Sequence, residues 1–363
     1  MKTSHAVVTA VGGALGVAAT GAAIAITAAR KRAAHDSHVE EPLGRLEPDR
    51  VSSVAADDGV VISVEEIDPP GTGRPDLTVV YVHGFALSRK CWHFQRRDLA
   101  RLTSPRVRQV LFDLRCHGRS SRGAAASCTI DQLARDLGEV LRAVVPDGPI
   151  VLIGHSMGGM TIMALAEQDP DLFADRVCGV VLIATTAGEV GKRGLPRPLL
   201  SRYNPVTRSV GRLAGWRPGL VEYVRAAGGA ITRRATRSLA FGPGQVSPSL
   251  VDFMVDMLGV TPVADLASFT DTFGTHDRYA ALVGLKHAHV QVISGDRDLF
   301  TPFAHAERIV AELPDATLVR AAGAGHMVML EQPDLVTDHL VMLLQQCAFG
   351  PGADRRRWWR RRS

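Results

Sequence analysis

Cysteine is scarce in this sequence, and its five copies are widely separated. They are Cys91, Cys116, Cys128, Cys178 and Cys347. Their number is odd and no C-x-x-C pair occurs, so the pattern signals neither a zinc site nor a disulfide framework. The simplest expectation is a set of reduced thiols in a cytosolic domain.

The central part of the chain also lacks the basic stripe that nucleic-acid-binding domains carry. Ten positive charges lie near the two ends: Lys2, Arg30, Lys31, Arg32, Arg355, Arg356, Arg357, Arg360, Arg361 and Arg362. Removing these ten from the net charge of +5 leaves about −5 for the rest. Nucleic acid is therefore not an expected partner. Basic ends beside a hydrophobic segment favour an anionic membrane surface instead.

The N-terminal region predicts membrane attachment. Residues 6–29 carry no charge, are long enough to span a bilayer as a helix, and are followed at once by three basic residues. We therefore expect residues 1–32 to form an anchor that keeps the following domain in the cytoplasm. Two alternatives are a cleaved signal peptide, which would make the protein secreted, and a segment that only lies on the membrane. Residues 33–49 are polar and are expected to be a linker.

Repeats and low-complexity segments are absent, and 363 residues fit one large domain with an insertion. Short apolar runs alternate with helical patterns, which predicts an α/β fold with a mostly parallel sheet flanked by helices. The expected strands are Val51–Ala55, Val60–Ile67, Thr78–Val82, Val110–Leu114, Ile150–Ile153, Val177–Ile183, Val290–Ser294 and Thr317–Val319. The expected helices are 129–145, 157–168, 302–313 and 333–346.

One interval interrupts this alternation and predicts a helical lid. No clean strand occurs between Ile183 and His289, where helical patches fall near 217–240 and 249–270. An insertion of this length in a compact domain is usually functional. The expected division is a core at 50–186 and 288–349, the lid at 187–287, and a basic tail at 350–363 that contains two tryptophans.

The strongest motif is Gly154-His155-Ser156-Met157-Gly158-Gly159, which follows an apolar strand and opens a helix. This is the context of a nucleophile elbow, in which a strained turn lifts the Ser156 hydroxyl out and leaves room only for glycine at Gly154 and Gly158. The N–H of Met157 lies at a helix N-terminus and can stabilise an oxyanion. His155 is expected to pack structurally.

With these residues the chain resembles the α/β-hydrolase superfamily from about Val51 to Gln346. His83-Gly84-Phe85 resembles a loop that supplies a second oxyanion donor in that family. The resemblance implies this donor role for the Phe85 N–H and a structural role for His83. The run from Asp113 to Ser120 resembles the family's D-x-R-G-x-G-x-S turn, with Cys116 where glycine is usual.

The resemblance also implies the remaining catalytic residues. The segment Gly295-Asp-Arg-Asp298 matches the family's G-x-x-D pattern and implies Asp298 as the acid, with Asp296 as the competitor. Gly323-Ala-Gly325-His326 matches the G-x-G-H pattern and implies His326 as the base. The order Ser156, Asp298, His326 is that of this superfamily and differs from the order in trypsin-like and subtilisin-like proteases.

These roles predict a serine hydrolase that forms an acyl-enzyme and needs neither metal nor organic cofactor. The expected substrate is a carboxylic ester, and membrane attachment favours a lipid or acyl ester. The alternatives are a cofactor-free haloperoxidase-like enzyme, an acyltransferase and a non-catalytic binding member of the fold. Epoxide and haloalkane hydrolases are disfavoured because they carry Asp at the nucleophile position.

The lid is rich in arginine, which allows either a solvated helical face or contact with anionic lipid. The residues are Arg193, Arg197, Arg202, Arg208, Arg212, Arg217, Arg225, Arg233, Arg234 and Arg237.

Overall fold

The computed structural model describes residues 36–190 and 229–350. The predicted anchor at 1–32, most of the basic tail and residues 191–228 of the insertion lie outside these ranges. Within them, no helix has both the length and the apolar character needed to cross a membrane. All five cysteines are free thiols.

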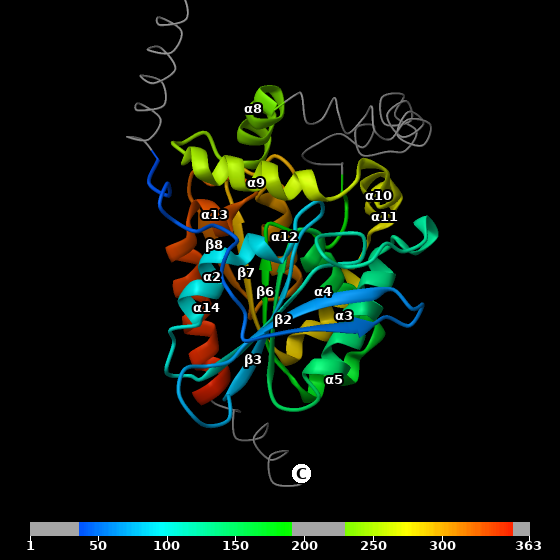
Figure 1. The fold of residues 1–363 in the computed structure, drawn as a ribbon. Helices are drawn as coiled ribbons and strands as arrows, with labels where there is room; N and C mark the ends of the chain where they lie inside the picture. Colours follow the sequence, from blue (N-terminus) through cyan, green and yellow to red (C-terminus); the bar gives the residue numbers. More distant parts are fainter. Residues whose placement is uncertain (1–35, 191–228, 351–363) are drawn as a thin grey trace, which may run out of the picture.

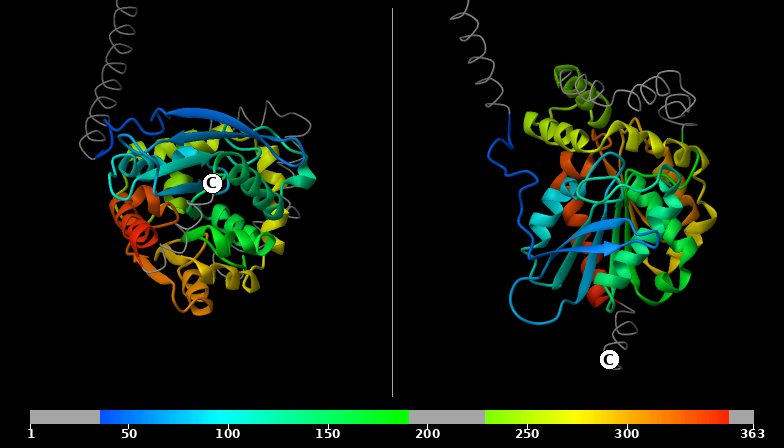
Figure 2. Two further views of the ribbon diagram at one scale, coloured as in Figure 1. Left: turned by 90° about the horizontal axis from the view of Figure 1, so that it is seen from below. Right: turned by 45° about the vertical axis from the view of Figure 1, so that its right-hand side comes forward.

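Eight strands form one sheet in the order β1-β2-β4-β3-β5-β6-β7-β8. The pairs β1–β2 and β2–β4 are antiparallel and all other pairs are parallel, which confirms the mostly parallel sheet. The right-hand view of Figure 2 shows the antiparallel β1–β2 hairpin in front. The strands are β1 Arg50–Ala55, β2 Val61–Ile67, β3 Leu77–Val82, β4 Val107–Phe112, β5 Ile150–His155, β6 Val177–Ile183, β7 His289–Gly295 and β8 Thr317–Ala321.

Helices cover both faces of this sheet (Figure 2). Strand β3 shows why: Val80 and Val82 contribute to one apolar core, whereas Val79 and Tyr81 contribute to the other. The first core is closed by α3, α4, α5 and α12, and the second by α2, α13 and α14. The bounds of these helices are α2 His93–Leu99, α3 Ile130–Val144, α4 Met157–Gln168, α5 Pro170–Asp175, α12 Ala304–Glu312, α13 Val328–Glu331 and α14 Pro333–Phe349. The short 3-10 helices are η1 Arg89–Trp92, η2 Ala125–Ser127 and η4 Ala280–His287.

Four described α-helices, followed by the 3-10 helix η4, lie between β6 and β7, where the sequence predicts the insertion. The four α-helices are α8 Gly229–Ala240, α9 Pro248–Val260, α10 Val263–Ser268 and α11 Thr270–Thr275. Figure 1 shows them together at the top, beyond the arrowheads of β6 and β7. They therefore face the edge of the sheet where the parallel strands end. Two of the described insertion arginines are engaged internally, Arg233 with Asp252 and Arg237 with the carbonyl oxygen of Gly242.

The described part of the expected linker is held against the domain. Asp36 accepts hydrogen bonds from the side chains of Ser247 and Ser249 at the start of α9. Glu41 pairs with His93 and Arg97 on α2 at 2.7 and 2.9 Å. Polar composition alone suggests a free linker, but here these carboxylates find specific partners on the folded domain.

Candidate active site

Ser156 occupies a strained turn between β5 and α4. Its backbone has φ 53° and ψ −118°, a conformation that residues other than glycine rarely adopt. The sharp turn brings α4 so close to the sheet that a Cβ on Gly158 would lie 2.1 Å from the carbonyl oxygen of Val82. A Cβ on Gly154 would lie 2.6 Å from the Gly159 nitrogen. Ser156 therefore lies in a sharp strand-to-helix turn, and neither Gly154 nor Gly158 has room for a side chain.

The loop from His83 to Ala86 lies beside this elbow. A Cβ on Gly84 would be 3.1 Å from the Ser156 Cβ, so the loop passes directly over the serine. Within the described residues, the N–H groups of Phe85 and Met157 have no hydrogen-bond acceptor. Free donors on either side of a serine hydroxyl are what an oxyanion needs.

Two buried histidines hold this loop. His83 Nε2 accepts the Leu114 N–H at 2.9 Å, so its Nδ1 carries the proton and donates to the Gly84 carbonyl oxygen at 2.8 Å. His117 Nε2 accepts the Ala86 N–H at 3.1 Å, and its Nδ1 donates to the Arg115 carbonyl oxygen at 2.8 Å. Burial lowers the pKa of His117 to about 4 and that of His83 well below its usual value. Both rings are therefore neutral supports. The family resemblance implies a structural role for His83, and no sequence motif pointed to His117.

His326 and Asp298 lie at the ends of β8 and β7, next to the elbow. Asp298 Oδ2 is 2.8 Å from His326 Nδ1. Burial opposes ionisation of Asp298, but the His326 ring and the Thr301 donors outweigh it and lower the pKa of this carboxyl group. The Thr301 hydroxyl donates to Oδ2 at 2.7 Å, and the N–H groups of Phe300 and Thr301 donate to Oδ1. Asp298 is thus an ionised acceptor that holds a proton on His326 Nδ1.

Asp296, the competing acid, does not reach the His326 ring. Its Oδ1 accepts the N–H of Gly323 at 2.8 Å and lies 3.8 Å from the Arg297 guanidinium. These contacts fasten the loop that leads to His326. The two aspartates therefore have different surroundings, and Asp298 is the one beside the imidazole.

His155, which the sequence analysis expects to be structural, packs against His326. The ring centroids are 4.8 Å apart, and His155 Nε2 donates to the His326 carbonyl oxygen at 3.0 Å. Burial, and then the neighbouring His326, lower the pKa of His155 to about 3. A ring with this pKa stays neutral at physiological pH and fixes the backbone of the histidine loop.

Glu331 is a further support that the sequence did not reveal. Its two carboxylate oxygens accept the N–H groups of Gly325 and Gly242 at 2.8 and 2.7 Å. The N–H of His326 in turn donates to the carbonyl oxygen of Ala240, the last residue of α8. The histidine loop is therefore joined to the insertion, and no local pattern could have predicted that long-range contact.

The described residues contain no hydrogen bond between the Ser156 hydroxyl and the His326 ring. Catalytic hydrogen bonds are often long before substrate binds and tighten in the reacting complex. The same residues contain no group of three or more His, Cys, Asp or Glu side chains that could hold a metal ion. The site consists of a serine, an imidazole and a carboxylate beside two free N–H groups.

This arrangement agrees with the family to which the sequence belongs. Residues 79–339 match the model of the alpha/beta hydrolase family, so the chain is a member of it. It is 26% identical over 294 residues to the Uncharacterized hydrolase YugF of Bacillus subtilis (strain 168), covering 78% of this chain and 94% of that protein.

Solved structures give the same result. A thermophilic esterase from Thermogutta terrifontis superposes with a TM-score of 0.62 at 25% identity, covering 82% of this chain and 98% of that one. A bromoperoxidase from Bacillus anthracis superposes with a TM-score of 0.63 at 19% identity, covering 82% and 100%. The similarity to the bromoperoxidase, at 19% identity, shows a shared fold and no more.

Proposed function

We propose that this protein is a carboxylic-ester hydrolase in which Ser156 is the nucleophile, His326 the general base and Asp298 the acid that orients it. The observation that carries the proposal is the 2.8 Å contact from Asp298 to His326 Nδ1 beside the strained elbow of Ser156. Because Nδ1 carries the proton, Nε2 is left with the lone pair that a general base needs.

The reaction follows from these positions. The Ser156 hydroxyl attacks the ester carbonyl while His326 Nε2 takes its proton. The N–H groups of Phe85 and Met157 stabilise the oxyanion, and the imidazolium returns its proton to the leaving alcohol. Water, activated by the same Nε2, then releases the acid from the acyl-enzyme. Asp298 stabilises the imidazolium at both stages.

The substrate class rests on the sequence. A membrane anchor at 1–32 and a basic tail favour lipid or acyl esters, and both segments lie outside the described residues. Membrane attachment and the cytoplasmic location of the domain therefore stay predictions. The esterase likeness supports a small-molecule ester.

The test measures turnover of p-nitrophenyl esters from acetate to palmitate, with Ser156→Ala as the blank. A fluorophosphonate probe should label the wild type and leave Ser156→Ala unlabelled, and turnover should drop to near background in the variant. Equal labelling of both proteins would reject Ser156. If the enzyme turns over peroxide in the presence of acetate faster than it hydrolyses esters, the haloperoxidase-like alternative is favoured. If it transfers the acyl group to an added alcohol in preference to water, the acyltransferase is favoured.

A further inference from the structure

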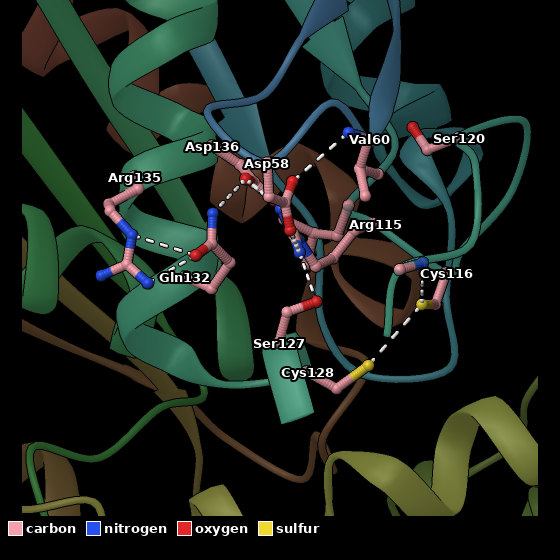
Figure 3. Close-up of polar contacts among 12 residues, drawn as sticks. Asp58, Val60, Arg115, Cys116, Ser120, Ser127, Cys128, Gln132, Arg135 and Asp136 are labelled. Carbon is pink, nitrogen blue, oxygen red and sulfur yellow. Dashed lines mark hydrogen bonds and ion pairs between the residues drawn. The ribbon is translucent and has the colours of Figure 1, made fainter. Parts of the chain in front are cut away.

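Two of the five cysteines lie side by side in a part of the molecule that the proposed chemistry does not use. The Sγ atoms of Cys116 and Cys128 are 3.7 Å apart, and both side chains are buried (Figure 3). A disulfide has an S–S length of about 2.05 Å. The two sulfur atoms therefore have to approach by less than 2 Å, a distance within reach of side-chain rotation and a small loop shift.

A buried arginine that pairs with two carboxylates links the segments that carry the two cysteines. The Arg115 guanidinium is fully buried and pairs with Asp136 at 2.6 Å and Asp58 at 2.7 Å. It also donates to the Ser127 hydroxyl at 2.7 Å. Arg115 precedes Cys116 and Ser127 precedes Cys128, so this hydrogen bond links the two segments that carry the cysteines, whose sulfur atoms face each other in Figure 3.

The surroundings of Cys116 favour its thiolate. Its Sγ accepts the N–H of Gly123 at 3.3 Å and faces the Cys128 thiol. The hydrogen bond from Cys128, opposed by burial and assisted by Gly123, lowers the pKa of the Cys116 thiol. The thiolate is the reactive form of cysteine toward oxidants. By contrast, burial raises the pKa of the Cys91 thiol well above its usual range.

The loop that joins the two cysteines lies against their sulfur atoms, because the Gly123 N–H donates to Cys116 Sγ and the Ala124 carbonyl oxygen accepts from Cys128 Sγ. Residues 121–126 are exposed except for the half-buried Gly123, and the loop contains three consecutive alanines, Ala124, Ala125 and Ala126. A small oxidant needs only a fluctuation of this loop to reach the sulfur atoms.

The pair is also joined to the candidate active site. Cys116 precedes His117, whose Nε2 accepts the N–H of Ala86 in the loop that carries Phe85. Cys116 and Ala86 both have a positive φ, 64° and 61°, so these two turns have little freedom to absorb a shift. A displacement at Cys116 is therefore expected to reach the Phe85 N–H.

We propose that Cys116 and Cys128 form an oxidation site at which a hydroperoxide creates a reversible disulfide, and that this disulfide slows the enzyme by displacing the Phe85 donor. The second half of the proposal rests on the proposed function. The first half concerns thiol chemistry alone.

The chemistry needs one equivalent of hydroperoxide. The Cys116 thiolate attacks a peroxide oxygen, so an S–O bond forms, the O–O bond breaks, and the leaving oxygen takes a proton. The Cys128 sulfur then attacks the sulfenic sulfur, which forms the S–S bond and expels water with the Cys128 proton. The two thiols lose two electrons and the peroxide gains them.

Three variants test the site in the full chain. Cys116→Gly removes one thiol at a position where the positive φ suits glycine, so it should fold. Cys128→Ser removes the other thiol, and Cys91→Ser is the matched control at a buried cysteine in the core on the other face of the sheet. Each protein is reduced, treated with hydrogen peroxide and alkylated. Mass spectrometry then counts the remaining thiols and maps linked peptides.

The wild type and Cys91→Ser should each lose two alkylatable thiols and yield a linked Cys116–Cys128 peptide, which dithiothreitol reverses. Cys116→Gly and Cys128→Ser should yield no such peptide. Wild type that keeps both thiols, or that forms sulfinic acid without the linked peptide, would overturn the site.

Fluorophosphonate labelling of Ser156 reports the coupling without requiring an ester substrate. Labelling of oxidised wild type should slow by about tenfold or more, since a misplacement near 1 Å can cost up to 10²-fold in an active site. It should recover on reduction and stay constant in Cys116→Gly and Cys128→Ser. A disulfide that leaves the labelling rate unchanged would overturn the coupling. Absence of labelling before oxidation would count against the proposed function and not against the disulfide.

Discussion

Replacement of Asp298 by asparagine tests the candidate triad with little change in shape. Asp298 Oδ1 accepts two backbone N–H groups, from Phe300 at 2.8 Å and Thr301 at 3.0 Å. Only the oxygen of the asparagine amide can occupy that position, because its NH₂ group would oppose both donors. The NH₂ group must therefore lie where Oδ2 lies now, 2.8 Å from His326 Nδ1.

This orientation forces the wrong tautomer on the imidazole. An amide N–H that points at Nδ1 needs a lone pair there, so the proton moves to Nε2, which can then no longer accept the Ser156 proton. Loss of the correct tautomer costs about 10⁴ in kcat in serine hydrolases of known mechanism. We expect a decrease of about 10³- to 10⁴-fold here, or about 4 to 5.5 kcal/mol in the barrier. KM should change little, because Asp298 is buried behind His326.

The matched control is Asp296→Asn, two residues away. Asparagine keeps an oxygen for the Gly323 N–H that Asp296 accepts now at 2.8 Å. Turnover of p-nitrophenyl butyrate should therefore stay within about threefold of the wild type, as for most changes remote from the reacting groups. Thermal unfolding of both variants separates a catalytic loss from a folding defect. A larger loss in Asp296→Asn than in Asp298→Asn, at equal stability, would refute the assignment of the acid.

Three further outcomes are expected. Gly158→Ala should lower the melting temperature severely or abolish folding, because its Cβ would meet the Val82 oxygen at 2.1 Å, whereas Gly274→Ala has open space and should be harmless in thermal melts. Thr301→Val removes the hydroxyl that donates to Asp298 at 2.7 Å and should lower kcat about tenfold at saturating ester, without the tautomer change. The free energy of unfolding, measured by urea titration, should be lower at about pH 5.5 than at about pH 7.5.

The strands were predictable because those buried on both faces are continuous apolar runs. Strand β6, Val177–Ile183, is fully buried and matches its expected bounds. Strand β4 was predicted at Val110–Leu114 but spans Val107–Phe112, because polar residues occupy its first half. One of them, Gln109, is fully buried and accepts the Tyr81 hydroxyl at 2.9 Å. That partner lies 28 residues away along the chain, so the local pattern could not reveal it.

Helix α2 was not predicted, for a related reason. Its sequence, from His93 to Leu99, contains two arginines in seven residues and has no apolar periodicity of useful length. Its polar residues are nevertheless largely buried, because Arg96 pairs with Glu65 at 2.9 Å and His93 pairs with Glu41 at 2.7 Å. Long-range ion pairs permit a burial that hydrophobicity alone would exclude.

The candidate site also contains residues that the sequence predicted and residues that only the structure revealed. Ser156, Asp298 and His326 follow strands in short motifs, and parallel strands bring their carboxyl ends to one edge, so their proximity follows from the fold. The groups that hold the surrounding loops lie outside these motifs. Glu331 holds Gly325, and His117 holds Ala86, only because the folded chain brings them into contact. The motifs therefore predict the candidate triad and leave the residues that hold its loops unassigned.

The pH dependence of stability tests whether the loops around the candidate active site depend on buried neutral histidines. His276 is a further buried histidine, and its Nε2 donates to the carbonyl oxygen of Thr186 at 3.1 Å. Burial lowers the pKa of His117 and His276 to about 4 and that of His155 to about 3, and it lowers the pKa of His83 well below its usual value. In the unfolded chain each has a pKa near 6.5. Between these values the unfolded state binds more protons, so stability is present above about pH 6.5 and is lost as the pH falls.

The size of the effect follows from the number of groups. One histidine contributes about 1.4 kcal/mol per pH unit below its unfolded pKa, so four contribute about 5 kcal/mol between pH 7.5 and 5.5. Burial raises the pKa of Asp113, Asp136 and Glu331, which acts in the opposite direction and reduces the net loss. His276→Asn removes one titrating ring outside the candidate triad, so its unfolding free energy should depend less steeply on pH than that of the wild type. Equal slopes for the two proteins, or a wild type that gains stability toward pH 5.5, would refute the view that neutral buried rings support these loops.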